Sequence, residues 1–359
     1  MKLITNLTLI AFLITLEIDS QPLYAQWDTD VHAATARLSD SGDSGCYEAA
    51  RSGSRRSALA CGGAACDELI SSCDCRLPLW IATADALFLN RSDPFSSVLA
   101  FNTANPTENL DAANFNFGVH TGFDLSLMRR IGGEKAIELR YFGIDHWNSQ
   151  LSEPTTPGDL FQVNAGVPVF TFSGSGIDAS YASALHSSEL NCRHWISDIL
   201  SVLVGFRYAE LNEHLSANLV GSAVPFNHET ETRNRLYGAQ LGGQVELWKQ
   251  KRLAVNAVGK AGIYGNAAGQ DSYFSTGVVT LSTSGRDGRT AFIGEVELNG
   301  AMKLTEHFAL RSGYRLLWLD GVALADKQLS VSDFANGTGF NSSGDVFYHG
   351  AFTGLEFSY

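Results

Sequence analysis

The stretch FNFGVHTGFDLSL, residues 115–127, alternates between two kinds of side chain. Its apolar members are Phe117, Val119, Phe123, Leu125 and Leu127, and between them stand Gly118, His120, Gly122, Asp124 and Ser126. Successive side chains of a β-strand point to opposite faces of the sheet. The stretch therefore predicts a strand with one apolar face and one polar or small face.

The same alternation recurs in nine other segments, at 79–89, 135–147, 181–195, 200–211, 231–248, 253–266, 289–303, 307–320 and 346–359. The connections between these segments alternate strictly between long and short, as an up-and-down barrel with short periplasmic turns and long outer loops requires. We therefore expect an all-β fold: a transmembrane, antiparallel, up-and-down β-barrel of ten strands. Twelve strands would result if FQVNAGVPVFTF (161–172) or STGVVTLS (275–282) formed a further hairpin; either segment could instead project outside or fold into the lumen as a constriction.

A soluble β-sandwich or lipocalin-like barrel is the alternative, and such a fold packs its large apolar side chains inward. In this chain the face opposite the apolar one carries mainly glycine and charge. Aromatic side chains also stand beside the short turns, at Trp80, Trp195, Trp248, Phe308 and Tyr359. Tryptophan and tyrosine favour the headgroup level of a membrane, because their rings are part apolar and part polar. Both patterns favour a membrane barrel with an aromatic girdle at its short-turn end.

The N-terminus predicts export. Lys2 precedes the apolar run LTLIAFLITL (7–16), and PLYAQ (22–26) follows it, which is the order of a secretory signal peptide cleaved after Ala25. Ten apolar residues are too few for a membrane-spanning helix, which needs roughly 20. We therefore divide the chain into a signal peptide (1–25), a Cys-rich periplasmic segment (26–77) and an outer-membrane barrel (78–359).

The chain ends in FTGLEFSY (352–359), which reads as a strand up to its last residue. In a closed barrel the final strand must pair with the first, because hydrocarbon cannot satisfy an open sheet edge. The spacing of Gly354, Phe357 and Tyr359 resembles the C-terminal assembly signal of bacterial outer-membrane proteins. That resemblance implies recognition by the barrel-assembly machinery.

Five cysteines crowd into the N-terminal segment, at Cys46, Cys61, Cys66, Cys73 and Cys75. In an exported chain they are candidates for disulfides, and their spacing matches no standard zinc motif. Because five is an odd number, one thiol is left over or pairs with another chain. A disulfide-tied knot, a plug entering the barrel and a cross-link between chains all remain open. Self-association of the chain, covalent or non-covalent, is therefore also open.

Charges favour some partners and positions over others. The formal net charge is -13, which argues against a nucleic-acid partner.

Register estimates across three short turns place opposite charges in pairs on the polar face: Asp124 with Arg140, Glu189 with Arg207, and Glu297 with Arg311. We expect these pairs to fill and stiffen a narrow lumen, where unpaired charges are costly. The alternative is that charges simply collect on a wet face.

Several phrases point to a known family: LWIATADALFLNR (79–91), HSSELNCRHW (186–195), VGFRYAELNEHL (204–215), NRLYGAQLGGQVEL (234–247) and LRSGYRLLWLDGVALA (310–325). Together they resemble the planctomycete-type putative β-barrel porin family. The resemblance implies an outer-membrane barrel and carries no catalytic residues that could be transferred.

No enzyme motif is apparent, and we expect neither a catalytic site nor a bound cofactor or metal. Asp145 and His146 stand at the height of the rim residues of omptin-like proteases, but the paired motifs of that family are missing. Cys192 and His194 share one face, and that face is the one expected to contact lipid.

Two roles remain: a narrow, charge-lined porin for small solutes, or a structural barrel whose outer loops bind a partner. In both, outer-membrane lipid is the surrounding medium.

Overall fold

The computed structural model describes residues 77–105, 107, 109–163, 170–222 and 225–359. The predicted signal peptide and the Cys-rich segment with its five cysteines lie outside the described residues. Among the residues described, no helix is both long enough and apolar enough to cross a membrane.

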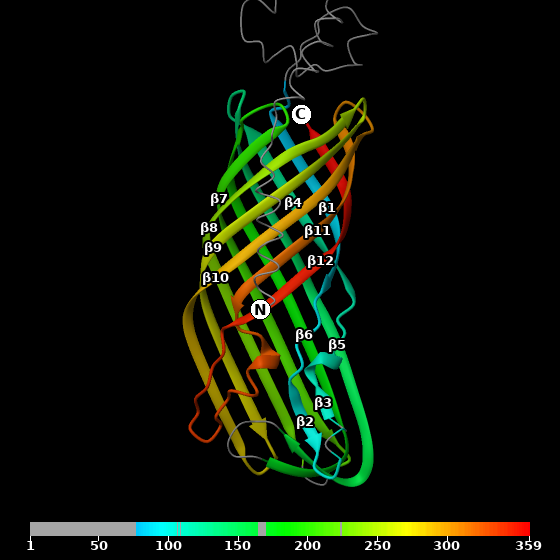
Figure 1. Ribbon diagram of the computed structural model, residues 1–359, viewed down its shortest axis with the longest axis vertical. Helices are drawn as coiled ribbons and strands as arrows, with labels where there is room; N and C mark the ends of the chain where they lie inside the picture. The colour runs from blue at the N-terminus through cyan, green and yellow to red at the C-terminus, as the bar shows by residue number, and fades with distance from the viewer. Residues whose placement is uncertain (1–76, 106, 108, 164–169, 223–224) are drawn as a thin grey trace, which may run out of the picture. The chain divides into compact units, whose positions relative to one another are not determined.

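Ten antiparallel strands close into a barrel, as the sequence predicts (Figure 1). They are β1 (Trp80–Arg91), β4 (Val119–Arg130), β5 (Lys135–Val163), β6 (Phe170–Trp195), β7 (Leu200–Val220), β8 (Asn227–Gln250), β9 (Leu253–Ser275), β10 (Thr280–Lys303), β11 (Phe308–Val322) and β12 (Gly344–Ser358). Each strand pairs with its neighbours along the chain, and β12 pairs with β1 to close the ring. The first long loop adds β2 (Val98–Asn102), β3 (Asn109–Asp111) and the 3-10 turn η1 (Ala112–Asn114), and β2 pairs with the outer part of β5.

The strands extend much farther at the long-loop end than the alternation pattern predicts. Strand β5 contains 29 residues and β8 and β10 contain 24 each, whereas β1 and β4 contain only 12. Residues 161–163 and 170–172 form the outer ends of β5 and β6, and Ser275 and residues 280–282 form those of β9 and β10. Within the described residues neither segment adds a barrel strand, and the wall remains ten strands wide.

The two faces of the wall differ as expected for a membrane barrel. Large apolar side chains point outward and are exposed, and we call this set the apolar belt: Phe123, Leu125, Leu127, Leu139, Leu190, Val204, Phe206, Leu241, Ile263, Val296, Leu298 and Leu355. The residues that alternate with them are buried in the lumen and are often charged, as with Asp124, Glu189 and Glu297. Because a soluble barrel would bury its apolar rows, this orientation excludes the soluble alternative.

Candidate functional site

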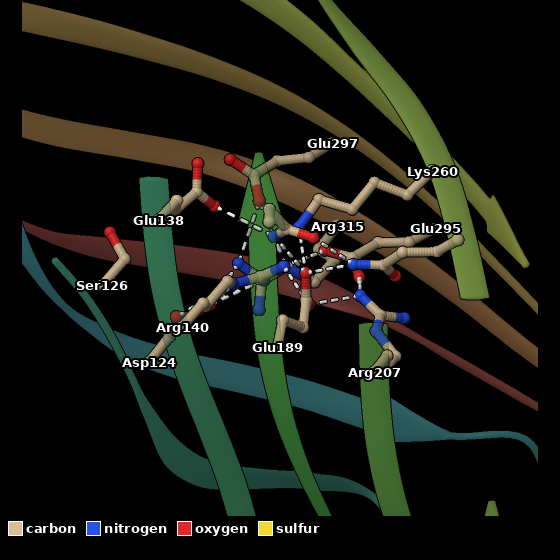
Figure 2. A network of polar contacts seen from close by, with 12 residues as sticks. Asp124, Ser126, Glu138, Arg140, Glu189, Arg207, Lys260, Glu295, Glu297 and Arg315 are labelled. Carbon is tan, nitrogen blue, oxygen red and sulfur yellow. Dashed lines mark hydrogen bonds and ion pairs between the residues drawn. The ribbon is translucent and has the colours of Figure 1, made fainter. Parts of the chain in front are cut away.

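Eight charged side chains meet inside the barrel and form a single charge cluster (Figure 2). Its members are Asp124, Arg140, Glu189, Arg207, Lys260, Glu295, Glu297 and Arg315. They come from β4, β5, β6, β7, β9, β10 and β11, and each is between 1% and 8% exposed. Four cations face four carboxylates, so the cluster is formally neutral. A cluster buried this deeply must be paired throughout, because each unpaired ion would cost several kcal/mol.

Arg140 connects three carboxylates. Its Nη2 lies 2.7 Å from Oδ2 of Asp124, and its Nη1 lies 3.0 Å from Oε1 of Glu189 and 2.7 Å from Oε1 of Glu295. Strands β5 and β10, which carry Arg140 and Glu295, are five positions apart in the ten-strand ring. The ion pair between them therefore reaches from one wall of the lumen to the opposite wall.

Glu189 is the most heavily paired carboxylate of the cluster. Arg207 Nη2 contacts both Glu189 Oε1 and Glu295 Oε2, and Lys260 Nζ lies 2.8 Å from Glu189 Oε2. Amide nitrogens of Asn191 and Gln240 donate to Glu189 Oε2 at 3.0 Å and 2.8 Å. Charged and polar donors thus surround both oxygens of this carboxylate.

The strand register differs from the predicted pairs at two of the three places. Glu189 is directly opposite Arg207, but Arg140 is opposite Ser126 and reaches Asp124 diagonally. Glu297 is opposite Arg315, with a 2.9 Å ion pair, rather than opposite Arg311. Arg311 lies nearer the short-turn end, where its closest carboxylate is Asp85 at 3.4 Å, and Glu297 is 3.6 Å away.

Four of the five aromatic residues named for the girdle share the outward face at the short-turn end. Trp248 reaches that face because a β-bulge between Glu246 and Trp248 reverses the alternation. Trp195 is different: it is on the same face of β6 as the buried Asn191 and Arg193, and the guanidinium of Arg130 lies 4.0 Å from its ring centroid. Its indole therefore belongs to the lumen side, and the simple end-of-strand rule was wrong for this residue.

The C-terminal strand closes the barrel through very close backbone approach. Gly354 is opposite Asp85 of β1, and a Cβ atom at residue 354 would lie 2.1 Å from the carbonyl oxygen of Ala84. Phe357 and Tyr359 point outward from the same strand. Only glycine fits at position 354, which gives this residue a structural role in addition to the assembly signal that the sequence predicts.

Above the charge cluster, toward the long loops, the lumen is filled by apolar side chains. Buried members of this layer are Leu87, Leu89, Phe142, Leu211, Leu236, Ile293, Leu317, Leu319, Tyr348 and Phe352. The predicted inner face of glycine and charged residues is therefore found only near the short-turn end. Farther out, the inner positions of the same strands are leucine, isoleucine and aromatic residues.

The last long loop, residues 321–343, folds back onto the inner wall and covers this layer. Its backbone is held by side chains of the wall: the Asn234 amide donates to Ala323 O at 2.8 Å and accepts from Ala323 N at 2.7 Å. The Asn266 amide donates to Gly321 O at 2.9 Å. The 3-10 turn η2 (Ala325–Lys327) contacts β7 and β8. We call residues 321–343 the lumen loop.

A second buried polar network ties the lumen loop to the wall. Arg91 Nη2 lies 2.6 Å from Glu213 Oε1, and Glu213 Oε2 accepts a hydrogen bond from the Ala325 N–H at 3.0 Å. The Tyr181 hydroxyl lies 2.5 Å from Glu213 Oε2 and 3.0 Å from Asp326 Oδ1. Burial, together with the neighbouring Glu213 carboxylate, raises the pKa of Asp326 to about 6. Docking of the loop therefore favours the protonated form of Asp326.

Sequence reasoning missed several members of these networks. Lys260, Arg91 and Asp326 were not singled out, because each comes from a strand or loop far from its partners in sequence. Glu295 and Arg315 were recognised only as charges on the polar face. A signal was present in the parity of Lys260, which shares the inner face of β9 with Gly262, Tyr264 and Asn266.

The rim residue Asp145 forms a different contact from the one considered in the sequence. Its Oδ1 lies 2.9 Å from His186 Nε2, and His186 Nδ1 lies 2.9 Å from the Tyr141 hydroxyl. These side chains are on the outward face. Cys192 and His194 also face outward, and Cys192 is a free thiol. Across the described part of the chain, no group of three or more His, Cys, Asp or Glu side chains could hold a metal ion.

Several solved outer-membrane barrels are similar to this chain at low sequence identity. The outer membrane protease OmpT of Escherichia coli is 12% identical, with 78% of this chain and 96% of that chain covered and a TM-score of 0.46. The toluene transporter TodX of Pseudomonas putida is 8% identical, with 78% and 90% covered and a TM-score of 0.33. LpxR from Salmonella typhimurium is 9% identical, with 78% and 100% covered and a TM-score of 0.26. No curated protein matches the sequence.

The family is shown by a match of its own sequence model. The model described as "Putative beta barrel porin-7 (BBP7)" matches residues 134–341, which is more than half of the chain. The matched region runs from the turn before β5 to the lumen loop, and it contains seven of the eight members of the charge cluster, all except Asp124. This chain belongs to the putative beta barrel porin-7 family of outer-membrane β-barrel proteins.

Proposed function

We propose that this chain is an outer-membrane barrel whose lumen is closed in the conformation described here, and that its function lies in the surface of its outer end. The observation that supports this most strongly is the ion pair between Arg140 and Glu295, which joins opposite walls of the barrel at 2.7 Å. A ten-strand barrel is narrow, and side chains alone fill barrels of about eight strands. Charged side chains that bridge such a lumen leave little room for a solute.

Two further features support a closed lumen. The apolar layer and the lumen loop lie farther out than the charge cluster, so a solute would meet three successive barriers. Seven of the eight cluster members, every one except Asp124, lie within residues 134–341, the region that the family model matches. The cluster therefore belongs mainly to the part of the chain that defines the family.

A narrow channel for small solutes is the second candidate. It is favoured by the family description as a porin and by the way the lumen loop is held, since hydrogen bonds from Asn234 and Asn266 are reversible. In that case the lumen loop would act as a gate, and the charge cluster would select ions once the gate opened. The two candidates differ in whether any current crosses the barrel.

Conductance in planar lipid bilayers separates these candidates. We expect the wild-type barrel to produce no current steps above background, and the same silence when residues 322–342 are replaced by a short Gly-Ser linker. Steps from the linker variant alone would support the gated channel. Steps from the wild type would overturn the closed-lumen proposal.

We also propose that the chain is not an enzyme. The family description as a porin supports this reading. The contact among Asp145, His186 and Tyr141 is on the outward face of the barrel, away from the lumen. Protease and lipase assays on the folded barrel, with His186→Ala as the control, test the proposal: activity that depends on His186 would contradict it.

A further inference from the structure

Three arginines point outward from the barrel directly beyond the outer edge of the apolar belt. On β8, Arg233 and Arg235 alternate with the buried Thr232, Asn234 and Leu236, so their side chains are on the outer face. Arg286 of β10 lies on the same face, because it is opposite Gly269 of β9, which in turn is opposite Arg233. We call Arg233, Arg235 and Arg286 the outer arginine patch.

The position of the patch relative to the belt is set by the strand alternation. Tyr237, which is two residues from Arg235 toward the short-turn end of β8, is 51% exposed, and Ile263 on the adjacent strand β9 is 69% exposed. The next outward residues toward the long loops are Arg235 on β8 and Gly265 on β9. The arginines thus begin within one or two alternation steps of the last large apolar side chains. That is the level at which lipid headgroups meet a membrane barrel.

The patch lies in a groove rather than on a flat wall. A broad open groove of about 1030 Å³ on this side of the protein is lined by all three arginines and by Tyr237, Gly265, Ala267 and Gly269. The small residues of β9 form its floor between β8 and β10. A Cβ atom at Gly269 would lie 3.7 Å from Arg286 Cγ, so the Arg286 side chain leans over this floor.

The charges around the patch leave it with a surplus of positive charge. Arg233 lies 3.8 Å from Glu210, and Arg235 is directly opposite Glu210 on β7, so one carboxylate lies at the level of three arginines. Within the described residues, no ion pair involves Arg286. Glu231 and Asp271, which also line the groove, are one row farther from the belt. An anion therefore finds its best position next to the belt, at the level of the arginines. This concentration of positive charge occurs in a chain whose net charge is -13.

We propose that the outer arginine patch binds the phosphorylated headgroup of an outer-leaflet lipid. The planar guanidinium group donates two parallel hydrogen bonds to a phosphate, which makes arginine the preferred side chain for this ligand. Arg233 and Arg286 are separated by two strand spacings, about 10 Å between backbones, so their long side chains can converge on one phosphate above Gly269. The acyl chains of the same lipid would lie along Ile263 of the belt and along Tyr237 and Phe292 on the neighbouring strands.

The test compares lipids on the full-length, detergent-folded barrel by native mass spectrometry. The probes are dioleoyl phosphatidate, whose headgroup is a phosphate monoester, and dioleoyl phosphatidylcholine, whose phosphate is shielded by choline. We expect phosphatidate to bind more tightly, and the variant R233Q/R235Q/R286Q to lose on the order of 100-fold in affinity for it, because each arginine near an anionic lipid surface contributes roughly a factor of five. The variant R129Q/K249Q/R252Q removes three positive charges at the short-turn end and should bind as the wild type does.

Three results would overturn the proposal. The first is equal affinity for the two lipids, and the second is an unchanged affinity in the outer-patch variant. The third is full competition by inorganic phosphate at concentrations comparable to the lipid, which would indicate a site for a free anion instead. Unchanged heat-modifiable migration of both variants in gels serves as the folding control.

Discussion

Arg207 offers the sharpest test of the charge cluster, because its removal affects two carboxylates at once. Its side chain is 1% exposed, and its Nη2 contacts both Glu189 and Glu295. In the variant Arg207→Ala, Glu189 keeps Arg140 and Lys260, and Glu295 keeps Arg140. The cluster then carries one uncompensated negative charge in a buried position.

The loss of stability in Arg207→Ala is limited because Arg140 and Lys260 still compensate part of the negative charge. Removing one partner of a buried ion pair destabilises a protein by about 3–5 kcal/mol, and with these cations in place we expect the lower end, about 3 kcal/mol. At about 2 °C per kcal/mol for a domain of this size, the midpoint of thermal unfolding should fall by roughly 6 °C. The assay is the temperature at which the folded, faster-migrating band disappears in heat-modifiable gel electrophoresis.

The matched control is Arg233→Ala, which removes the same side chain from the outward face. Its ion pair with Glu210 is 3.8 Å long and its side chain is 62% exposed, so the loss should stay below about 1 kcal/mol. The double variant R207A/E295Q should recover part of the loss, because it removes the charge that Arg207 leaves unpaired. Equal midpoints for wild type, Arg207→Ala and Arg233→Ala would refute the reasoning that the cluster is buried and paired.

Three further variants test other parts of the structure. Burial and Glu213 raise the pKa of Asp326 to about 6, so docking of the lumen loop should be complete below the ordinary value of 3.8 and weaken as the pH rises through about 6. Hydrogen exchange of amides 322–339, corrected for intrinsic rates, should show this pH dependence in the wild type and not in Asp326→Asn. Gly354→Ala should reduce the yield of folded barrel, since its Cβ would meet Ala84 O at 2.1 Å, whereas Gly300→Ala, with nothing nearer than 3.9 Å, should fold normally; equal yields would contradict the close-approach reading. Leu241→Arg should destabilise the barrel by about 2–4 kcal/mol in a bilayer if Leu241 faces its middle, and an unchanged denaturant midpoint in lipid vesicles would place that side chain elsewhere.

The ten barrel strands were predictable from sequence because their halves nearer the short turns follow a two-residue period, which a bulge interrupts at the end of β8, between Glu246 and Trp248. Their outer ends were not, since the outward residues beyond the belt become polar. On β8 the outward series changes from Leu241 and Tyr237 to Arg235, Arg233 and Glu231, so that both faces read as hydrophilic although the strand continues. Where a strand extends beyond the bilayer, its outward residues are no longer apolar, and the alternation of apolar and polar residues on which the prediction depends is lost.

The charge cluster was predictable in kind and only partly in detail. The inner face had to pair its charges, and the residues Glu189 and Arg207 were placed opposite each other correctly by turn length. Contacts across the lumen, such as Arg140 with Glu295, depend on the curvature of the closed ring and on side-chain length. The docking of the lumen loop could not be predicted either, because residues 321–343 show no periodic pattern that indicates which strands the loop will contact.

The direction of the two faces is tested most directly by methyl NMR of the leucine and valine side chains in nanodiscs whose lipids carry a nitroxide on the acyl chain. Signals from Leu139, Val204 and Leu241, which are 54%, 53% and 67% exposed, should be broadened by the spin label. Signals from the lumen residues Leu211, Leu236 and Leu317, which are at most 1% exposed, should keep their intensity. Equal broadening of both groups, or broadening of the second group alone, would contradict a barrel with its apolar rows in lipid and its charges around the axis.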